Sequence, residues 1–73
     1  KVRFKTNVNN FNIKITDEGG NVLVDEFQRR RRFDYQLLEG PYEIEFTGYK
    51  IETRVIEISI LRTAILLHQI NLF

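Results

Sequence analysis

The 73-residue sequence contains no cysteine and only one histidine, His68. Without cysteine it has no disulfide bonds, no thiolate zinc sites and no thiol catalysis. A single imidazole does not form a zinc site without thiolates or a second histidine, so no metal ion or cofactor is expected. Long apolar runs are also missing, since the longest is residues 64–67, far short of the roughly 18 residues of a membrane-spanning helix. We therefore expect a soluble domain without a membrane span.

Catalytic side chains are equally scarce. The only serine, Ser59, and His68 lie on strands predicted to be adjacent, yet a nucleophile and a base still need an orienting acid and an oxyanion hole. Glu43 and Glu45 share one face of a strand at a period of two, which could suggest acid and base roles, but the same alternation predicts that this face is a solvated polar surface. The sequence therefore predicts a protein that is not an enzyme, with His68 as a rim or backbone-bonded residue.

Charge of one sign is not in excess, because eleven basic side chains face ten acidic ones and leave a formal net charge of +1. No field of the whole molecule would attract nucleic acid or an anionic membrane. Nucleic acid is accordingly not expected as a partner. Any charged partner must be recognised by a local patch.

What the sequence does contain is an alternation of apolar and polar residues with a period of two, which is typical of strands with one buried face. The predicted strands cover residues 1–5, 11–16, 22–24, 32–37, 42–46, 51–60 and 64–72. The Asp17–Asn21 segment predicts a tight turn, residues 25–28 a polar connection, and a parity change a bulge near Arg54. This pattern predicts one all-β domain over residues 1–73, either a β-sandwich or a small barrel. Of the two we expect a small antiparallel β-sandwich of about seven strands with immunoglobulin-like architecture. Because the chain opens on Lys1 without methionine, we expect a mature product of processing or a piece excised from a longer protein, and we favour the latter.

The segment from Val55 to Phe73 is the most apolar part of the chain, with apolar residues on both strand faces. Such a segment is either a buried central strand pair or an interface. If it is an interface, we expect contacts with a protein partner or a second copy through a sheet face or edge. The residues predicted to make that contact are Ile56, Ile58, Ile65 and Leu67.

Four consecutive arginines, Arg29, Arg30, Arg31 and Arg32, depart from the composition of an average sandwich. In one interpretation they form an exposed connection or edge, where charge prevents edge-to-edge aggregation. In the other they bind an acidic glycan or another polyanion, because arginine guanidinium groups grip such oxygens two at a time. The sequence alone leaves both open.

Residues 37–50 resemble the PEGA domain and its relatives, the carboxypeptidase-regulatory-like and transthyretin-like β-sandwich modules. The resemblance lies in a glycine-containing turn, Tyr42, two alternating apolar residues and then Gly48 and Tyr49 followed by lysine. Residues 12–23 are similar to the first hairpin of those families, in which a strand meets an acidic, glycine-rich turn.

This resemblance implies a transthyretin-like or PEGA-like fold and an accessory module without a catalytic motif. Modules of this kind are common in secreted or cell-surface proteins, so an extracytoplasmic location is expected. The implied function is a structural, adhesive or protein–protein interaction module of a larger assembly. The alternative function is a ligand-binding module that grips a polyanion through the arginine run.

Overall fold

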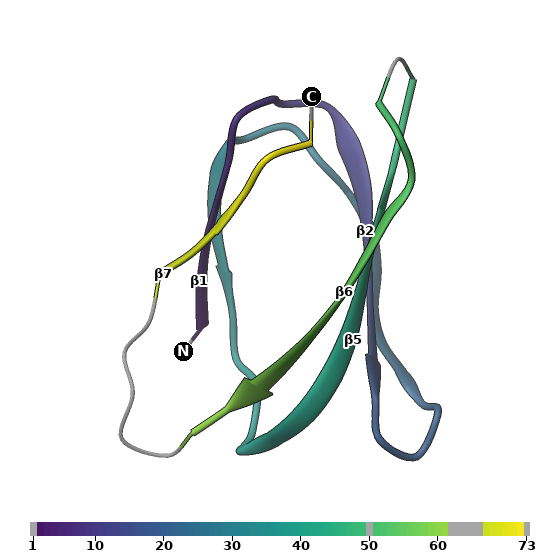
Figure 1. The fold of residues 1–73 in the computed structure, drawn as a ribbon, viewed down its shortest axis with the longest axis vertical. Coiled ribbons are helices and arrows are strands. Elements are labelled where there is room, and N and C mark those ends of the chain that lie inside the picture. Colours follow the sequence, from purple (N-terminus) through teal and green to yellow (C-terminus); the bar gives the residue numbers. More distant parts are fainter. Residues whose placement is uncertain (1, 50, 62–66, 73) are drawn as a thin grey trace.

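The computed structural model describes residues 2–49, 51–61 and 67–72, with the backbone alone for Leu67, and these residues form strands and connections (Figure 1). The seven strands are β1 (Val2–Thr6), β2 (Phe11–Asp17), β3 (Val22–Gln28), β4 (Arg32–Tyr35), β5 (Gly40–Thr47), β6 (Arg54–Ile60) and β7 (Leu67–Ile70). Among the described residues, no helix is long and apolar enough to cross a membrane. The all-β sandwich expected from the sequence is confirmed.

The strands are divided between two sheets (Figure 1). The large sheet has the order β3-β2-β5-β6 and is antiparallel throughout. The small sheet has the order β4-β1-β7, in which β1 pairs antiparallel with β4 and parallel with β7. The architecture is that of a sandwich, but the partition differs from the immunoglobulin constant domain, where the first, second, fourth and fifth strands share one sheet.

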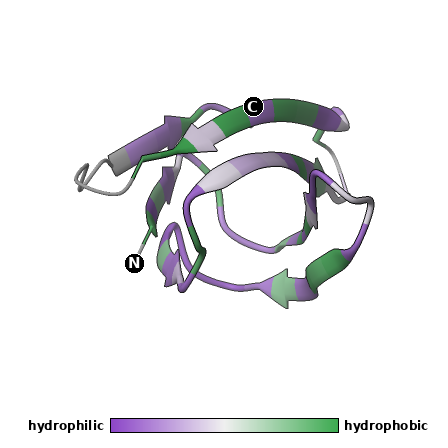
Figure 2. Ribbon diagram, turned by 90° about the horizontal axis from the view of Figure 1, so that it is seen from below, coloured by the Kyte–Doolittle hydropathy of each residue, from purple (hydrophilic) through white to green (hydrophobic). Residues whose placement is uncertain are grey.

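The core consists of the inward-facing residues of both sheets. Alternate residues of β1, β2 and β5 are buried, and Figure 2 shows the corresponding alternation of hydrophobic and hydrophilic residues along the strands. The fully buried side chains are Phe4, Phe11, Phe46, Ile13, Ile15 and Ile44. Phe33 of β4 stacks on Phe4 with ring centroids 5.4 Å apart and meets Phe11 of the opposite sheet at 5.7 Å. Aromatic contacts therefore join the two layers.

Three details of the predicted strands were wrong. Strand β3 continues to Gln28, so residues 25–28 are part of a strand and not a polar connection. Strand β6 begins at Arg54 and not at residue 51. It pairs with β5 without a shift of register, so the bulge predicted near Arg54 is absent. The irregularity lies instead between Ile15 and Thr16, where β2 pairs with β3.

The apolar C-terminal segment does not form a central hairpin. Strand β6 is an edge of the large sheet and β7 is an edge of the small sheet, so the two belong to different layers. After β7, Leu72 is buried in the core, and its backbone N–H donates to Asn7 Oδ1 at 2.7 Å. The end of the described chain is thus held against the β1–β2 connection.

Phe11→Ala tests how far the fold depends on the aromatic core. We expect it to lower the free energy of unfolding by about 3 to 5 kcal/mol, because it removes a fully buried ring and leaves a cavity. That is a large part of the roughly 4 to 11 kcal/mol expected for a domain of this size. Phe27→Ala is the matched control, since Phe27 is 55% exposed, and it should change stability far less. Urea denaturation of both variants measures the difference, and equal losses would contradict the assigned core.

Candidate functional site

The outer surface of the small sheet is basic. Because Phe4 and Phe33 point into the core, their neighbours along β1 and β4 point outward. This places Arg3, Lys5 and Arg32 on one surface, with Lys5 directly opposite Arg32 in the β1–β4 ladder. We call these three residues the basic face. In the same ladder Asp34 lies opposite Arg3.

The arginine run leads into this face. Arg29, Arg30 and Arg31 connect β3 to β4 and are exposed, while Arg32 is the first residue of β4. The backbone N–H of Thr6 donates to the Arg31 carbonyl at 2.7 Å, which fixes the end of the connection beside β1.

Arg3 and Lys5 extend the basic patch to a neighbouring strand, although they stand far from the arginine run in the sequence. The alternation of residues 1–5 already indicated that these two side chains face outward. What the sequence did not reveal is that β1 and β4 are neighbours. A shallow depression of about 310 Å³ lies here, lined by Arg3, Arg32 and Asp34 together with both phenylalanines.

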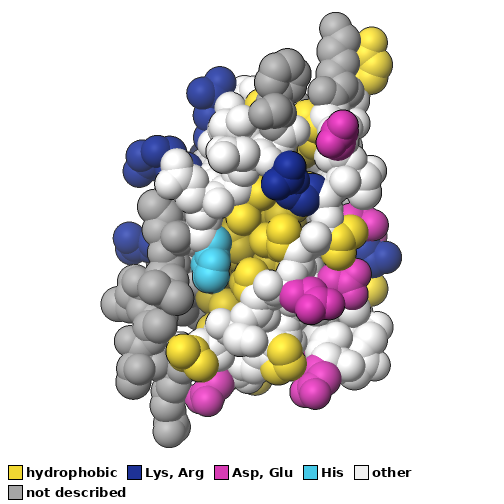
Figure 3. Space-filling view, in the orientation of Figure 1, with side chains coloured by type: hydrophobic (Ala, Val, Ile, Leu, Met, Phe, Trp, Pro, Cys, Tyr) yellow, Lys and Arg dark blue, Asp and Glu magenta, His cyan; other side chains and the backbone are white. Residues whose placement is uncertain are grey.

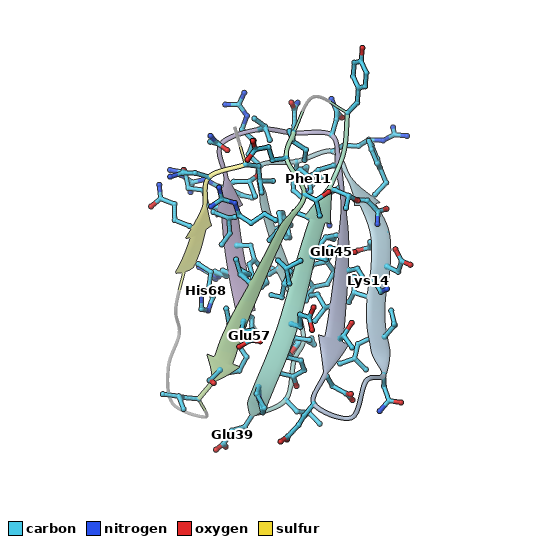
Figure 4. All side chains as sticks on the ribbon, turned by 45° about the vertical axis from the view of Figure 1, so that its right-hand side comes forward. Phe11, Lys14, Glu39, Glu45, Glu57 and His68 are labelled. Atoms are coloured by element: carbon cyan, nitrogen blue, oxygen red, sulfur yellow. The ribbon has the colours of Figure 1, made fainter. Side chains whose placement is uncertain are left out.

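The outer surface of the large sheet is acidic. Asp25, Glu43, Glu45 and Glu57 lie on the strand faces that point away from the core, and Lys14 is the one cation that the ladders place among them. Figure 4 labels Lys14, Glu45 and Glu57 on three neighbouring strands. We call the four carboxylates the acidic face. The prediction that Glu43 and Glu45 share an outward face is confirmed.

Two of these carboxylates, Glu43 and Glu57, are directly opposite each other in the β5–β6 ladder. Together with Glu18 they line a depression of about 490 Å³ at the end of the large sheet where Pro41 and Ser59 also lie. The described residues contain no group of three or more side chains arranged to hold a metal ion. The depression is therefore an acidic surface feature.

Ser59 and His68 do not come together. Their strands belong to different sheets, so the prediction that they lie on adjacent strands was wrong. Ser59 pairs with Pro41 on the outer face of the large sheet, whereas His68 pairs with Phe4 and faces inward. The His68 and Phe4 rings are 5.6 Å apart, and His68 is half-buried.

An opening between the edges β6 and β7 exposes part of the apolar interior, and Figure 3 shows hydrophobic side chains gathered there beside His68. Of the four residues predicted to form an interface, Ile56 and Ile58 lie on the inward face of β6, half-buried and packed against the core. Ile65 lies outside the described residues, as does the side chain of Leu67. An interface through these four residues stays a prediction.

The opposite side of the sandwich, between β3 and β4, is bridged by a polar network that the sequence did not reveal. The Tyr35 hydroxyl donates to Glu26 Oε1 at 2.6 Å and accepts from Gln28 Nε2 at 2.7 Å. Burial, together with the hydrogen bond to the Glu26 carboxylate, raises the pKa of Tyr35 to about 12, and the hydrogen bond from Gln28 acts in the opposite direction. The network links β3 of the large sheet to β4 of the small sheet through hydrogen bonds between side chains.

The predicted turn between β2 and β3 is held by Asp17 and Asn21. The Asp17 carboxylate accepts from the Asn21 backbone N–H at 2.9 Å and from the Asn21 side-chain amide, and these bonds lower the pKa of Asp17. Gly20 has a φ of 84°, a left-handed conformation that glycine adopts without strain. The carboxylate of Asp17 is therefore engaged in closing the turn.

No family model matches the sequence, and neither a curated protein nor a solved structure gives a significant match.

The network around Tyr35 predicts a loss of stability at high pH. The phenol of an unfolded chain loses its proton near pH 10, whereas the folded Tyr35 keeps its proton up to about pH 12. Stability that is present below pH 10 should therefore fall as the pH rises from about 10 to 12. The Tyr35→Phe variant should lack this decline, and Tyr49→Phe, which changes an 86% exposed side chain, should keep it. Urea unfolding midpoints across this range measure the effect, and parallel curves for the wild type and Tyr35→Phe would contradict it.

The β2–β3 turn predicts the opposite dependence at low pH. The pKa of Asp17 is lower in the folded chain than its ordinary value of 3.8. The stabilisation is thus present above that value and is lost as the pH falls through the folded pKa. Asp17→Ala should unfold at a lower urea concentration than the wild type at neutral pH, and the two midpoints should converge on acidification. Glu18→Ala removes a neighbouring carboxylate as a control, and an Asp17→Ala difference that persists in acid would argue against this role.

Proposed function

We propose that this chain is a non-enzymatic protein–protein interaction module of a larger assembly, which makes its contacts through the outer faces of its two sheets. The observation that carries this proposal is the separation of charge between the faces. The outer face of the small sheet carries three cations and one carboxylate, and the outer face of the large sheet carries four carboxylates and one cation. A net charge of only +1 conceals this arrangement.

Separated charge favours specific docking because it attracts surfaces of opposite sign and repels those of the same sign. Exposed apolar side chains accompany the charges at the edges of the large sheet, where Phe27 of β3 is 55% exposed and Val55 of β6 is 50% exposed. Aromatic residues are enriched at protein interfaces relative to the rest of the protein surface.

The resemblance of residues 37–50 to PEGA-like and transthyretin-like modules supports the same function, because those modules are accessory domains that attach or space larger units. It also supports an extracytoplasmic or cell-surface location for the parent protein. The β-sandwich architecture agrees with this resemblance.

A second candidate function is the binding of an acidic glycan or another polyanion. The observation in its favour is that the β1–β4 ladder adds Arg3 and Lys5 to the arginine run. Six cations, including Arg29–Arg31, thereby gather around one end and one face of the small sheet. Guanidinium groups in such a cluster bind sulfate or carboxylate groups in pairs.

Two measurements on the 73-residue chain separate the two functions. The first is sedimentation velocity over a wide concentration range at moderate salt, and the second is a titration against heparin as the polyanionic probe. The interaction module predicts concentration-dependent association that survives the double substitution Arg29→Ser and Arg30→Ser. The polyanion site predicts salt-sensitive heparin binding that this variant weakens by about tenfold or more. A chain that stays monomeric at every concentration and binds heparin would favour the second function over the first.

A further inference from the structure

Each face of the sandwich carries a pair of like charges directly opposite each other. On the basic face the pair is Lys5 and Arg32, and on the acidic face it is Glu43 and Glu57. Side chains directly opposite on neighbouring strands are about 5 Å apart, and like charges at this distance destabilise a sheet. A surface of opposite charge would relieve the repulsion within each pair. The chain itself carries such a surface on its other side.

We propose that the acidic face of one copy of this chain docks on the basic face of a second copy. This inference rests on the proposed function and names its partner. The two surfaces of the contact are different, so each copy keeps one unoccupied face of each type. A contact of this kind repeats without closing and produces an open-ended stack of copies. Contacts between identical faces are disfavoured, because they would bring like charges together.

The ladders indicate how successive copies are oriented. Consider a half-turn about the stacking axis, with β1 of one copy over β5 of the next and the two strands antiparallel. Lys5 then lies over Glu43, and Arg3 lies over Glu45, two residues further along both strands. In the small sheet β4 is the neighbour of β1, and in the large sheet β6 is the neighbour of β5. The half-turn places these two neighbours on the same side of the contact, so β4 lies over β6.

The contact between β4 and β6 completes the match. Arg32, which is opposite Lys5, lies over Glu57, which is opposite Glu43. Asp34 lies over the uncharged Val55, so the one carboxylate among the basic residues meets no like charge. In this single register the cation pair of one copy therefore lies over the carboxylate pair of the next.

Stacking without the half-turn is less favourable. If β1 lies over β5 and the two strands are parallel, then β4 lies over β2. In the register that places Arg3 over Glu43 and Lys5 over Glu45, Arg32 lies over Lys14, because Arg32 is opposite Lys5 and Lys14 is opposite Glu45. The half-turn avoids this contact between two cations. Charge complementarity thus selects one orientation of the two.

Charge reversal tests the stack directly. In one variant, Lys5→Glu with Arg32→Glu, both faces are acidic, and in the other, Glu43→Lys with Glu57→Lys, both faces are basic. Each reversed side chain changes the formal charge by two units, so the net charge of +1 becomes −3 in the first variant and +5 in the second. Sedimentation velocity at low salt should show each variant as a monomer at concentrations where the wild type associates. An equimolar mixture should associate again, because acidic faces then meet basic faces on both sides.

Matched controls separate face contacts from overall charge. Arg29→Glu with Arg54→Glu and Glu39→Lys with Glu52→Lys give the same two net charges from exposed residues outside both faces. Each control variant should still associate by itself to within about threefold of the wild type, since its faces are intact. Circular dichroism of all four variants reports whether they fold. Control variants that become monomeric like the face variants would overturn the assignment to these faces.

The wild-type chain provides an arm of the test that does not depend on any variant. Raising the salt from about 0.02 M to about 0.5 M should weaken association by about tenfold or more, because the added salt screens the attraction between the charges of the two faces. Association that is insensitive to salt, or that persists in either face variant alone, would overturn the stack. Such a result would still agree with a protein–protein interaction module, but it would remove the outer faces of the two sheets as the contact between copies. A wild type that is monomeric at every concentration at low salt would overturn the stack and remove self-association from the proposed function.

Discussion

The packing of Phe33 against Phe4 and Phe11 is the contact on which the rest of the structure depends. Phe33 belongs to β4 of the small sheet, and Phe11 belongs to β2 of the large sheet, so this cluster holds the layers together. Because side chains alternate along a strand, fixing these rings inward also fixes their neighbours outward. The positions of the surface charges follow from the core.

This dependence explains how a nearly neutral chain acquires two oppositely charged faces. The cations of the small sheet come from both strands of its antiparallel ladder, with Arg3 and Lys5 in β1 and Arg32 in β4. The carboxylates of the large sheet come from β3, β5 and β6. A shift of one residue in any of these strands would turn the charges inward and the apolar residues outward, which would expose the core. The register required by packing is therefore also the register that separates the charges.

The two open sides of the sandwich are treated differently. Between β3 and β4, Tyr35 bridges the sheets through Glu26 and Gln28, so polar groups seal that side with hydrogen bonds between side chains. Between β6 and β7, half-buried isoleucines and His68 lie at an apolar opening (Figure 3). The hydrogen bonds on the first side satisfy the polar groups of Glu26 and Gln28, so β3 continues through these residues as a strand. The second side leaves part of the core less deeply buried than the centre of the large sheet.

The sequence by itself determined the number of strands and, for β1, β2 and β5, their inward faces, because a period of two requires only that each strand have one buried side. Phe11, Ile13 and Ile15 could be placed in the core, and Glu43 and Glu45 on the surface, from their spacing alone. Only the tertiary structure decided which strands are neighbours, since pairing depends on contacts between residues far apart in the chain. The sequence therefore did not show that Arg3 and Lys5 lie beside Arg32 of the arginine run. For the same reason it placed Ser59 and His68 on adjacent strands, although their strands belong to different sheets. The sequence also did not reveal that residues 25–28 continue β3, because Glu26 and Gln28 are hydrogen-bonded there by a tyrosine of the opposite sheet.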